Sequence, residues 1–268
     1  MIRAALTLLL ACAQLAAGEL LRYEGSLEAM GTSFGLVLYG RDSNRLRSAA
    51  DQAFEEVRRL EAMLSNYRKE SEWSEINREA ADRPVVVSDE LFRLLSDCLD
   101  YSRKSQGTFD ITVGPLMKLW GFYKGSGRLP HRAEVRVVMA RVGYRNVILD
   151  PRAKTVRFAK KGVEIDPGGI GKGYAVDQMA AILKANGLDS ALITAGGSSI
   201  YAMGSPPGEK GWTVKIRHPR KHEEAIQEVV LRNESMSTSG SYEKFFRAGR
   251  RVYSHIMDRS EEHTSELQ

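Results

Sequence analysis

Cysteine is nearly absent from this chain of 268 residues, and several familiar catalytic patterns are absent as well. The only cysteines are Cys12 and Cys98, and no cysteine and histidine residues stand at the spacing of a zinc site. No Gly-x-Ser-x-Gly sequence marks the nucleophile of a hydrolase. Repeats and low-complexity linkers are also absent. The remaining composition, 43% hydrophobic and 27% charged, is that of a globular protein and excludes a disordered or collagen-like one.

No dense block of one charge stands out along the chain. The formal net charge is +5, and lysines and arginines are scattered, with the densest run at residues 218–222. A nucleic-acid-binding protein usually gathers its cations on one face, so this pattern favours an ordinary solvated surface. A modest positive field would still attract an anionic ligand.

The N-terminus has the pattern of a secretory signal. Arg3 precedes an apolar stretch at residues 4–17, and Ala16-Ala17-Gly18 supplies small residues for cleavage. The apolar stretch is shorter than the roughly 20 residues of a transmembrane helix. We therefore predict a signal peptide at residues 1–18 and export to an oxidising compartment; a buried N-terminal helix is the alternative. Removal of the signal would leave Cys98 as the single thiol, with no internal disulfide to form.

Hydrophobic periodicity predicts an α+β fold. Residues 20–38 alternate apolar and polar side chains around Met30-Gly31-Thr32, as two strands joined by a turn would. Strands and helices mix without strict alternation. Helices are predicted at residues 42–64, 88–107, 132–142 and 173–187. Further strands are predicted at residues 84–87, 146–149, 155–158, 163–166, 190–194, 199–203, 212–217 and 226–231.

A glycine-rich loop is the sharpest local signal for binding. A predicted strand ends at Asp166 and enters residues 167–173, with Lys172 at the start of a helix. Exposed N–H groups and the positive end of a helix suit phosphate or pyrophosphate. The spacing fits neither the P-loop nor the dinucleotide fingerprint. Two further turns, at residues 195–198 and 237–242, could complete a polyanion site built from loops. Each of the three could also be no more than a tight turn.

One histidine is a candidate general base. His255 stands near the end of a predicted strand, with Asp258 close behind it. Spacing alone favours a histidine that is simply satisfied within a sheet.

Taken together, nine blocks of this sequence occur in the order found in one family. Between about residue 22 and residue 258 the chain resembles the ApbE family of FAD:protein FMN transferases. The blocks are Met30-Gly31-Thr32, Ser65-Asn66-Tyr67, Gly107-Thr108-Phe109-Asp110, Pro115 to Phe122, Asp166 to Asp177, Gly196-Gly197, Gly211-Trp212, residues 239–242 and Ser254 to Asp258.

The resemblance implies a periplasmic enzyme, either soluble or membrane-anchored, with a two-lobed α/β domain and FAD in the cleft between the lobes. Such enzymes split FAD with Mg²⁺, place FMN on a threonine or serine of an acceptor protein, and release AMP. His255 matches the catalytic histidine, and Gly169 matches a position whose backbone carbonyl binds the metal. The positions that match FAD contacts are Met30, Tyr67, Thr108, Phe109, Asp110, Asp166, Lys172 and Ile256.

The family pattern stops at Asp258. We therefore interpret residues 19–258 as a C-terminally incomplete transferase domain and residues 259–268, which are polar and patternless, as a non-native tail. A divergent natural tail is the alternative. Because Mg²⁺ prefers about six oxygen ligands and one carbonyl cannot hold it, we expect the chain as written to be poorly active.

Two other functions stay open at this point. One is a Mg²⁺-dependent FAD pyrophosphatase that uses water as the acceptor. The other is a flavin-binding protein without catalysis. Neither involves a nucleic acid.

Overall fold

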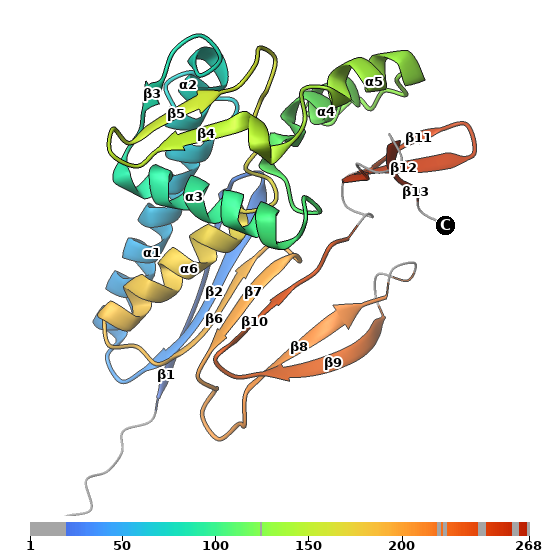
Figure 1. Cartoon of the computed structure of the whole chain (residues 1–268). Coiled ribbons are helices and arrows are strands. Elements are labelled where there is room, and N and C mark those ends of the chain that lie inside the picture. Colours follow the sequence, from blue (N-terminus) through green and yellow to red (C-terminus); the bar gives the residue numbers. More distant parts are fainter. Residues whose placement is uncertain are drawn as a thin grey trace, which may run out of the picture.

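The computed structural model describes residues 20–123, 125–218, 221, 224–240, 245–258 and 263–266 (Figure 1). The predicted signal peptide lies outside them. Within these ranges, no helix combines the length and apolar character needed to cross a bilayer. Helices and sheets are mixed, which confirms the predicted α+β class.

An antiparallel sheet of five strands, in the order β1-β2-β6-β7-β10, forms the centre of the larger lobe. In β2, Phe34, Leu36 and Leu38 are buried on one face while Val37 and Tyr39 pack toward the other, so the alternation seen in the sequence is a two-sided burial pattern. The strands are β1 (Leu21–Ala29), β2 (Thr32–Gly40), β6 (Ser190–Ala195), β7 (Ser199–Met203) and β10 (Glu234–Ser237).

Helices α1 (Ser43–Leu64) and α6 (Gly171–Ala185) pack side by side on one face of this sheet, and α3 (Asp89–Lys104) lies over them (Figure 1). The caps follow the predicted pattern. Asp42 Oδ1 accepts from the N–H groups of Asn44 and Arg45 at the start of α1, and the Ser88 hydroxyl accepts from Leu91 N at the start of α3.

A two-stranded sheet of β8 (Trp212–Arg217) and β9 (Ala225–Leu231) covers part of the opposite face. Trp212, Val214 and Leu231 pack there against Val37 and Ile200. A third sheet, in the order β3-β5-β4, lies beside α3, and Lys154 between β4 and β5 contacts Asp89 and Phe92 near the start of that helix (Figure 1). Its strands are β3 (Val85–Val86), β4 (Val147–Asp150) and β5 (Thr155–Phe158).

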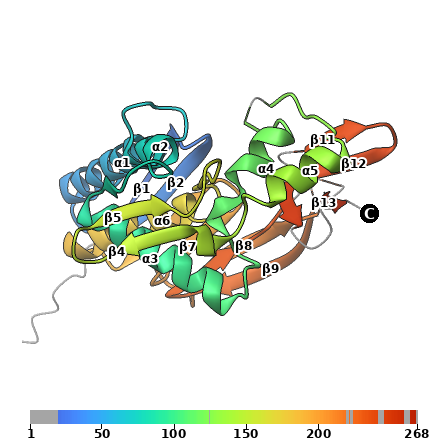
Figure 2. The ribbon, with the colours of Figure 1, turned by 45° about the horizontal axis from the view of Figure 1, so that its top comes forward.

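The second lobe has its own core. Leu116, Trp120, Val135, Val142 and Tyr253 are buried together, so helices from the middle of the chain pack against strands from its end (Figure 2). Its elements are helices α4 (Gly114–Leu119) and α5 (Arg132–Met139) and strands β11 (Phe245–Ala248), β12 (Arg251–Asp258) and β13 (His263–Glu266). The 3-10 helices η1 (Ile111–Val113) and η2 (Tyr144–Asn146) adjoin the core of the larger lobe through Ile111 and Tyr144. Strand β13, which pairs with β12, falls in the segment 259–268 that shows no periodicity.

Three predicted elements are wrong in detail. Helix α2 (Glu72–Glu79) occupies the stretch that the sequence analysis left without a helix, and the Ser71 hydroxyl caps it by accepting from Ser74 N. Helix α6 starts at Gly171 rather than after Gly173. The segment 163–166 is not a strand of any sheet.

That last segment is held by other groups instead. Ile165 N donates to the Asn77 side chain, and Asp166 N donates to the carbonyl of Ile111. An apolar, extended run can therefore satisfy its backbone without a neighbouring strand.

Candidate functional site

Three turns that are far apart in the sequence meet at one end of the central sheet. Lys172 Nζ, in the first turn of α6, donates to Ser198 Oγ at 2.6 Å. Thr238, which follows β10, donates from its backbone to the Ser198 carbonyl at 3.0 Å and from its hydroxyl to the Gly197 carbonyl at 2.8 Å. The glycine loop and both further turns are thus in direct contact, as the loop-built site requires. Residues 241 and 242 of the third turn lie outside the described residues.

The turn between β1 and β2 adds a fourth member. Gly196 N donates to the Ser33 carbonyl at 2.8 Å. A side chain on Gly196 would bring its Cβ within 2.4 Å of Thr32 Oγ1, and Gly196 also has a positive φ of 59°. Only glycine fits this crossing of two turns. Met30 itself has a φ of 51°, and its N–H donates to Glu61 Oε1 at 2.7 Å.

Helix α6 points its N-terminus at this group of turns. Ile170 occupies the position before the helix and has no polar side-chain atom to accept from the first N–H groups. A Cβ built on Gly173 would meet nothing within 4 Å. A helix N-terminus that is open to solvent, with a lysine in its first turn, favours the binding of a negatively charged group.

Asp166 lies at the entrance of the glycine loop and is 7% exposed. Its Oδ2 accepts from Tyr123 OH at 2.5 Å and from Asn66 Nδ2 at 2.9 Å, while its Oδ1 accepts from Gly168 N at 2.8 Å. A Cβ on Gly168 would lie 2.7 Å from the same Oδ1, which explains glycine there. The carboxylate therefore fixes the shape of the loop from a buried position.

Two tyrosines flank Asp166. The rings of Tyr67 and Tyr123 meet edge to face at 6.2 Å. Burial, and then the nearby negative charge of Asp166, raise the pKa of both hydroxyls, so both stay protonated at neutral pH. Tyr67 is 75% exposed, and its ring is available for stacking, as predicted for a flavin or adenine contact.

The other side of the glycine loop has a hollow of about 530 Å³. Phe109 meets the ring of Tyr101 edge to face at 6.2 Å, and a Cβ on Gly169 would lie 3.2 Å from Phe109. Two of the predicted site residues, Phe109 and Gly169, thus line one cavity. The lining is Tyr101, Lys104, Ser105, Phe109, Gly169 and Ile170.

Thr108 and Asp110 make local structural contacts. The Thr108 hydroxyl donates to the Ser105 carbonyl at 2.8 Å, after the end of α3. Asp110 Oδ1 accepts from the backbone and the hydroxyl of Thr112, and its Oδ2 accepts from Tyr144 N. These bonds connect η1 to η2, and the predicted contact of both residues with a ligand stays a prediction.

His255 and Ile256 lie in β12 of the second lobe. The His255 ring meets Phe122 at 6.5 Å, and Ile256 N donates to the Ser254 hydroxyl. Phe122 is followed directly by Tyr123, the donor to Asp166. The histidine is therefore connected to the glycine loop through two consecutive aromatic residues.

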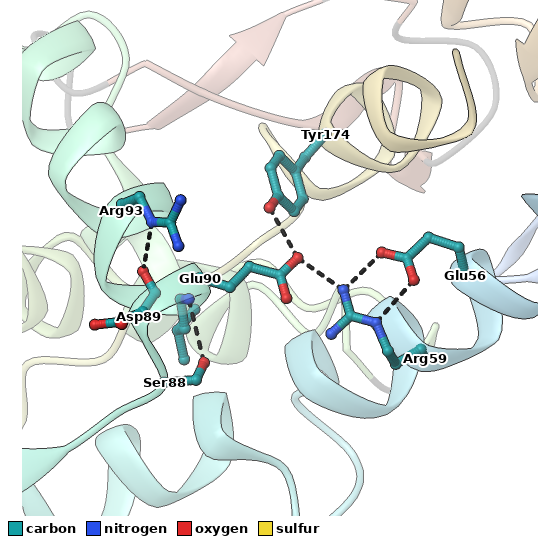
Figure 3. Close-up of polar contacts among 8 residues, drawn as sticks. Glu56, Arg59, Ser88, Asp89, Glu90, Arg93 and Tyr174 are labelled. Atoms are coloured by element: carbon teal, nitrogen blue, oxygen red, sulfur yellow. Dashed lines mark hydrogen bonds and ion pairs between the residues drawn. The ribbon is translucent and has the colours of Figure 1, made fainter. Parts of the chain in front are cut away.

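A polar cluster fixes the start of α6 against α1 and α3 (Figure 3). Glu90 Oε1 accepts from Arg59 at 2.7 Å and from Tyr174 OH at 2.9 Å, and Arg59 also donates twice to Glu56. The guanidinium of Arg59 lowers the pKa of Glu90 below its usual value. Tyr174 and Lys172 both lie in the first turn of α6, so this cluster holds the turn that carries the lysine.

Sequence reasoning missed Tyr123, because it has no special spacing and only the fold brings it to Asp166. Asn66 and Ser198 stood inside the quoted blocks without a role. No group of three or more His, Cys, Asp or Glu side chains suited to a metal occurs in the described ranges. The magnesium requirement stays a prediction.

The fold and these contacts define an α+β protein with a site built from turns at the end of a sheet and a helix N-terminus. The ApbE family model matches residues 30–266, and the chain belongs to this family. Two curated relatives are named FAD:protein FMN transferase. The one from Klebsiella pneumoniae (strain 342) is 32% identical over 239 residues, 88% of this chain and 72% of the relative. The one from Treponema pallidum (strain Nichols) is 32% identical over 232 residues, 81% of this chain and 64% of the relative.

Solved structures agree with the fold. The ApbE protein from Thermotoga maritima superposes with a TM-score of 0.84 at 31% identity, over 91% of this chain and 79% of that one. The flavinyl transferase ApbE from Pseudomonas stutzeri, in its apo form, gives 0.80 at 27%, over 92% and 77%. The resemblance inferred from sequence blocks is confirmed. The chain spans less than two thirds of the Treponema relative.

Proposed function

We propose that this protein is an FAD:protein FMN transferase that moves FMN onto a threonine or serine hydroxyl of an acceptor protein and releases AMP. The relatives described above are named FAD:protein FMN transferase, which supports the transfer of FMN from FAD to a protein. The observation that carries the proposal most is the 2.6 Å contact of Lys172 with Ser198, because it joins the glycine loop to the turns that would hold a diphosphate. These turns offer N–H groups, hydroxyls and one ammonium, which are the groups that bind a diphosphate.

The chemistry assigned to the side chains is as follows. The acceptor hydroxyl oxygen forms a bond to the FMN phosphorus of FAD, and the bond from that phosphorus to the bridging oxygen breaks. AMP leaves with the bridging oxygen. His255 accepts the proton of the hydroxyl, and Lys172 offsets negative charge on the phosphates. Tyr67 and Phe109 would stack on the rings of FAD.

Three further properties belong to the same proposal. The reaction would require Mg²⁺, whose positive charge neutralises phosphate oxygens when it is bound. The protein would act in the periplasm after loss of residues 1–18. It could also be held at the membrane by a lipid anchor. The support for these three is the sequence pattern and the family resemblance.

One assay tests the proposal. The natural full-length protein, the form expected to be active, is incubated with FAD, Mg²⁺ and an FMN-binding domain that carries a threonine acceptor, and the mass of the domain and the free AMP are measured. A gain of one FMN unit with equal AMP is expected. AMP with an unmodified domain would mean FAD hydrolysis, and bound FAD without AMP would mean a non-catalytic flavin-binding protein. A parallel reaction with EDTA should give no transfer, and added Mg²⁺ should restore it.

A single variant isolates the role of the histidine. His255→Ala should lose transfer by at least about a hundredfold, the size of general-base effects, while FAD fluorescence still reports binding. Transfer at the unaltered rate would remove His255 from the reaction.

A further inference from the structure

Arginines from two distant parts of the sequence come together on the second lobe. Helix α5 carries Arg132 and Arg136, and the β11–β12 hairpin carries Arg247, Arg250 and Arg251. All five side chains are exposed. We call these five arginines the basic surface. The sequence separates them into two groups, which is why the charge looked scattered along the chain.

The two groups belong to one surface because their elements share a core. Val135 of α5 and Tyr253 of β12 are buried in the same cluster. The loop before α5 also touches the hairpin, since a Cβ on Gly127 would lie 2.3 Å from Phe246. Figure 2 shows α5 beside β11 and β12.

The charge of this lobe is strongly one-sided. Its described residues within 114–146, 245–258 and 263–266 include nine lysines and arginines but only three acids, Glu134, Asp258 and Glu266, which gives +6. The whole chain carries +5, so the rest of the molecule is net acidic. Within the lobe, Lys118 pairs with Glu164 and Arg128 pairs with Glu134.

The basic surface adjoins the proposed catalytic base. Arg251 and His255 lie on the same strand, four residues apart, which is about 13 Å along the strand at 3.3 Å per residue. A protein that presents a hydroxyl to His255 must therefore pass close to these arginines. A positive surface at that distance would attract and orient an acidic one.

The composition favours a protein partner over a lipid surface. Eight of the nine cations are arginines, and exposed apolar side chains, Val137 at 59% and Phe245 at 43%, stand among them. Protein interfaces are enriched in arginine and aromatic residues and depleted in lysine. An anionic membrane, in contrast, attracts lysine and arginine alike.

We propose that the basic surface is the docking site for an acidic face of the acceptor protein, next to the hydroxyl that receives FMN. This inference rests on the proposed function, because it assumes that the hydroxyl is delivered to His255. It assigns the recognition of the acceptor to residues outside the FAD site.

Binding of a labelled peptide tests the docking without any chemistry. The probe is a fluorescein-labelled peptide in which glutamates surround one threonine, compared with a matched peptide that has glutamine in place of glutamate. We expect the intact chain to bind the glutamate peptide at least about tenfold more tightly at low salt, with the difference vanishing near 1 M salt. The variant Arg132→Glu/Arg250→Glu should lose this preference.

A matched control reverses the same number of charges elsewhere. Arg41→Glu/Arg47→Glu changes one residue just before α1 and one near the start of α1, so it also reverses two exposed charges outside and inside a helix. It should bind the glutamate peptide as the intact chain does. Equal loss of glutamate-peptide binding in both variants would overturn the proposal, because the overall positive charge of the protein would then explain the binding without a specific surface.

Two further measurements complete the test. Vesicles containing phosphatidylglycerol are sedimented with each variant; arginine-dependent binding to vesicles, without binding to the peptide, would overturn the proposal in favour of a membrane surface. FAD binding is titrated in parallel and should be the same in all variants. A protein that binds the peptide but no FAD would sink the proposed function alone.

Discussion

Tyr123 donates its hydroxyl proton to Asp166 Oδ2 across 2.5 Å, although the two residues are separated by 43 positions in the sequence. The preceding residue, Phe122, meets the ring of His255. This pair therefore joins the glycine loop of the larger lobe to the lobe that carries the candidate base. The bond is charge-assisted and largely buried, which makes it strong and sensitive to geometry.

Removing the hydroxyl should loosen the glycine loop. In Tyr123→Phe, Asp166 Oδ2 retains only Asn66 as a side-chain donor of the two described above. We expect FAD to bind about tenfold more weakly, since a hydrogen bond to a charged group is worth about 1.5–3 kcal/mol and part of it will be recovered from water. Fluorescence titration of FAD measures this. Tyr39→Phe, on β2 away from the loop, should bind FAD normally; equal weakening in both variants would contradict the prediction.

The local elements of this fold were readable from the sequence where a pattern extended over several turns. Helix α1 has buried residues every three or four positions, and Asp42 caps it. Helix α2 was missed because it has two turns and only Trp73 and Ile76 as large buried side chains. A short helix gives too few repeats to distinguish it from a polar loop.

The site was predictable in part for a different reason. A glycine-rich turn can be recognised from its composition alone. In the structure these turns are neighbours, joined by the hydrogen bonds of Lys172, Ser198 and Thr238. Pairing across distant segments leaves no such local mark. The bond of Tyr123 to Asp166 and the gathering of arginines on α5 and the β11–β12 hairpin both depend on how the lobes fold, and neither could be inferred from spacing.

Lys172 should discriminate between phosphorylated and unphosphorylated flavins. In Lys172→Met the side chain keeps its length but loses the ammonium that contacts Ser198. We expect FAD affinity to fall about tenfold to a hundredfold, as for loss of a charged hydrogen bond, and riboflavin affinity to stay unchanged. Titration of both ligands by flavin fluorescence measures the difference. An equal loss for riboflavin would show that the lysine acts only through the shape of the site.

Cys98 should be chemically inert in the folded protein. It is fully buried in α3, and burial raises the pKa of its thiol to about 12. Because the thiolate is the reactive form, a disulfide reagent at pH 8 should label no Cys98 until denaturant is added. The labelling is measured by mass after removal of residues 1–18, which contain the other cysteine. Rapid labelling of the native protein would mean that α3 opens locally.

The cluster around Glu90 should make stability depend on pH in a defined direction. Arg59 lowers the pKa of Glu90 in the folded state, so the charged carboxylate stabilises the fold at neutral pH. This contribution is present above the ordinary carboxyl pKa of about 4.3 and is lost as the pH falls through the lowered pKa of the folded state.

In Glu90→Gln, which keeps an acceptor for Tyr174 but removes the charge, we expect the free energy of unfolding to fall by about 1 kcal/mol at pH 7. The gap between the variant and the intact chain should close below about pH 4, as urea denaturation at each pH would measure. Glu75→Gln removes a carboxylate from an exposed pair with Arg83 and should change stability little, because exposed pairs contribute little. A gap for Glu90→Gln that stays constant from pH 7 to pH 3 would show that packing, rather than the charge, holds α6 against α1 and α3.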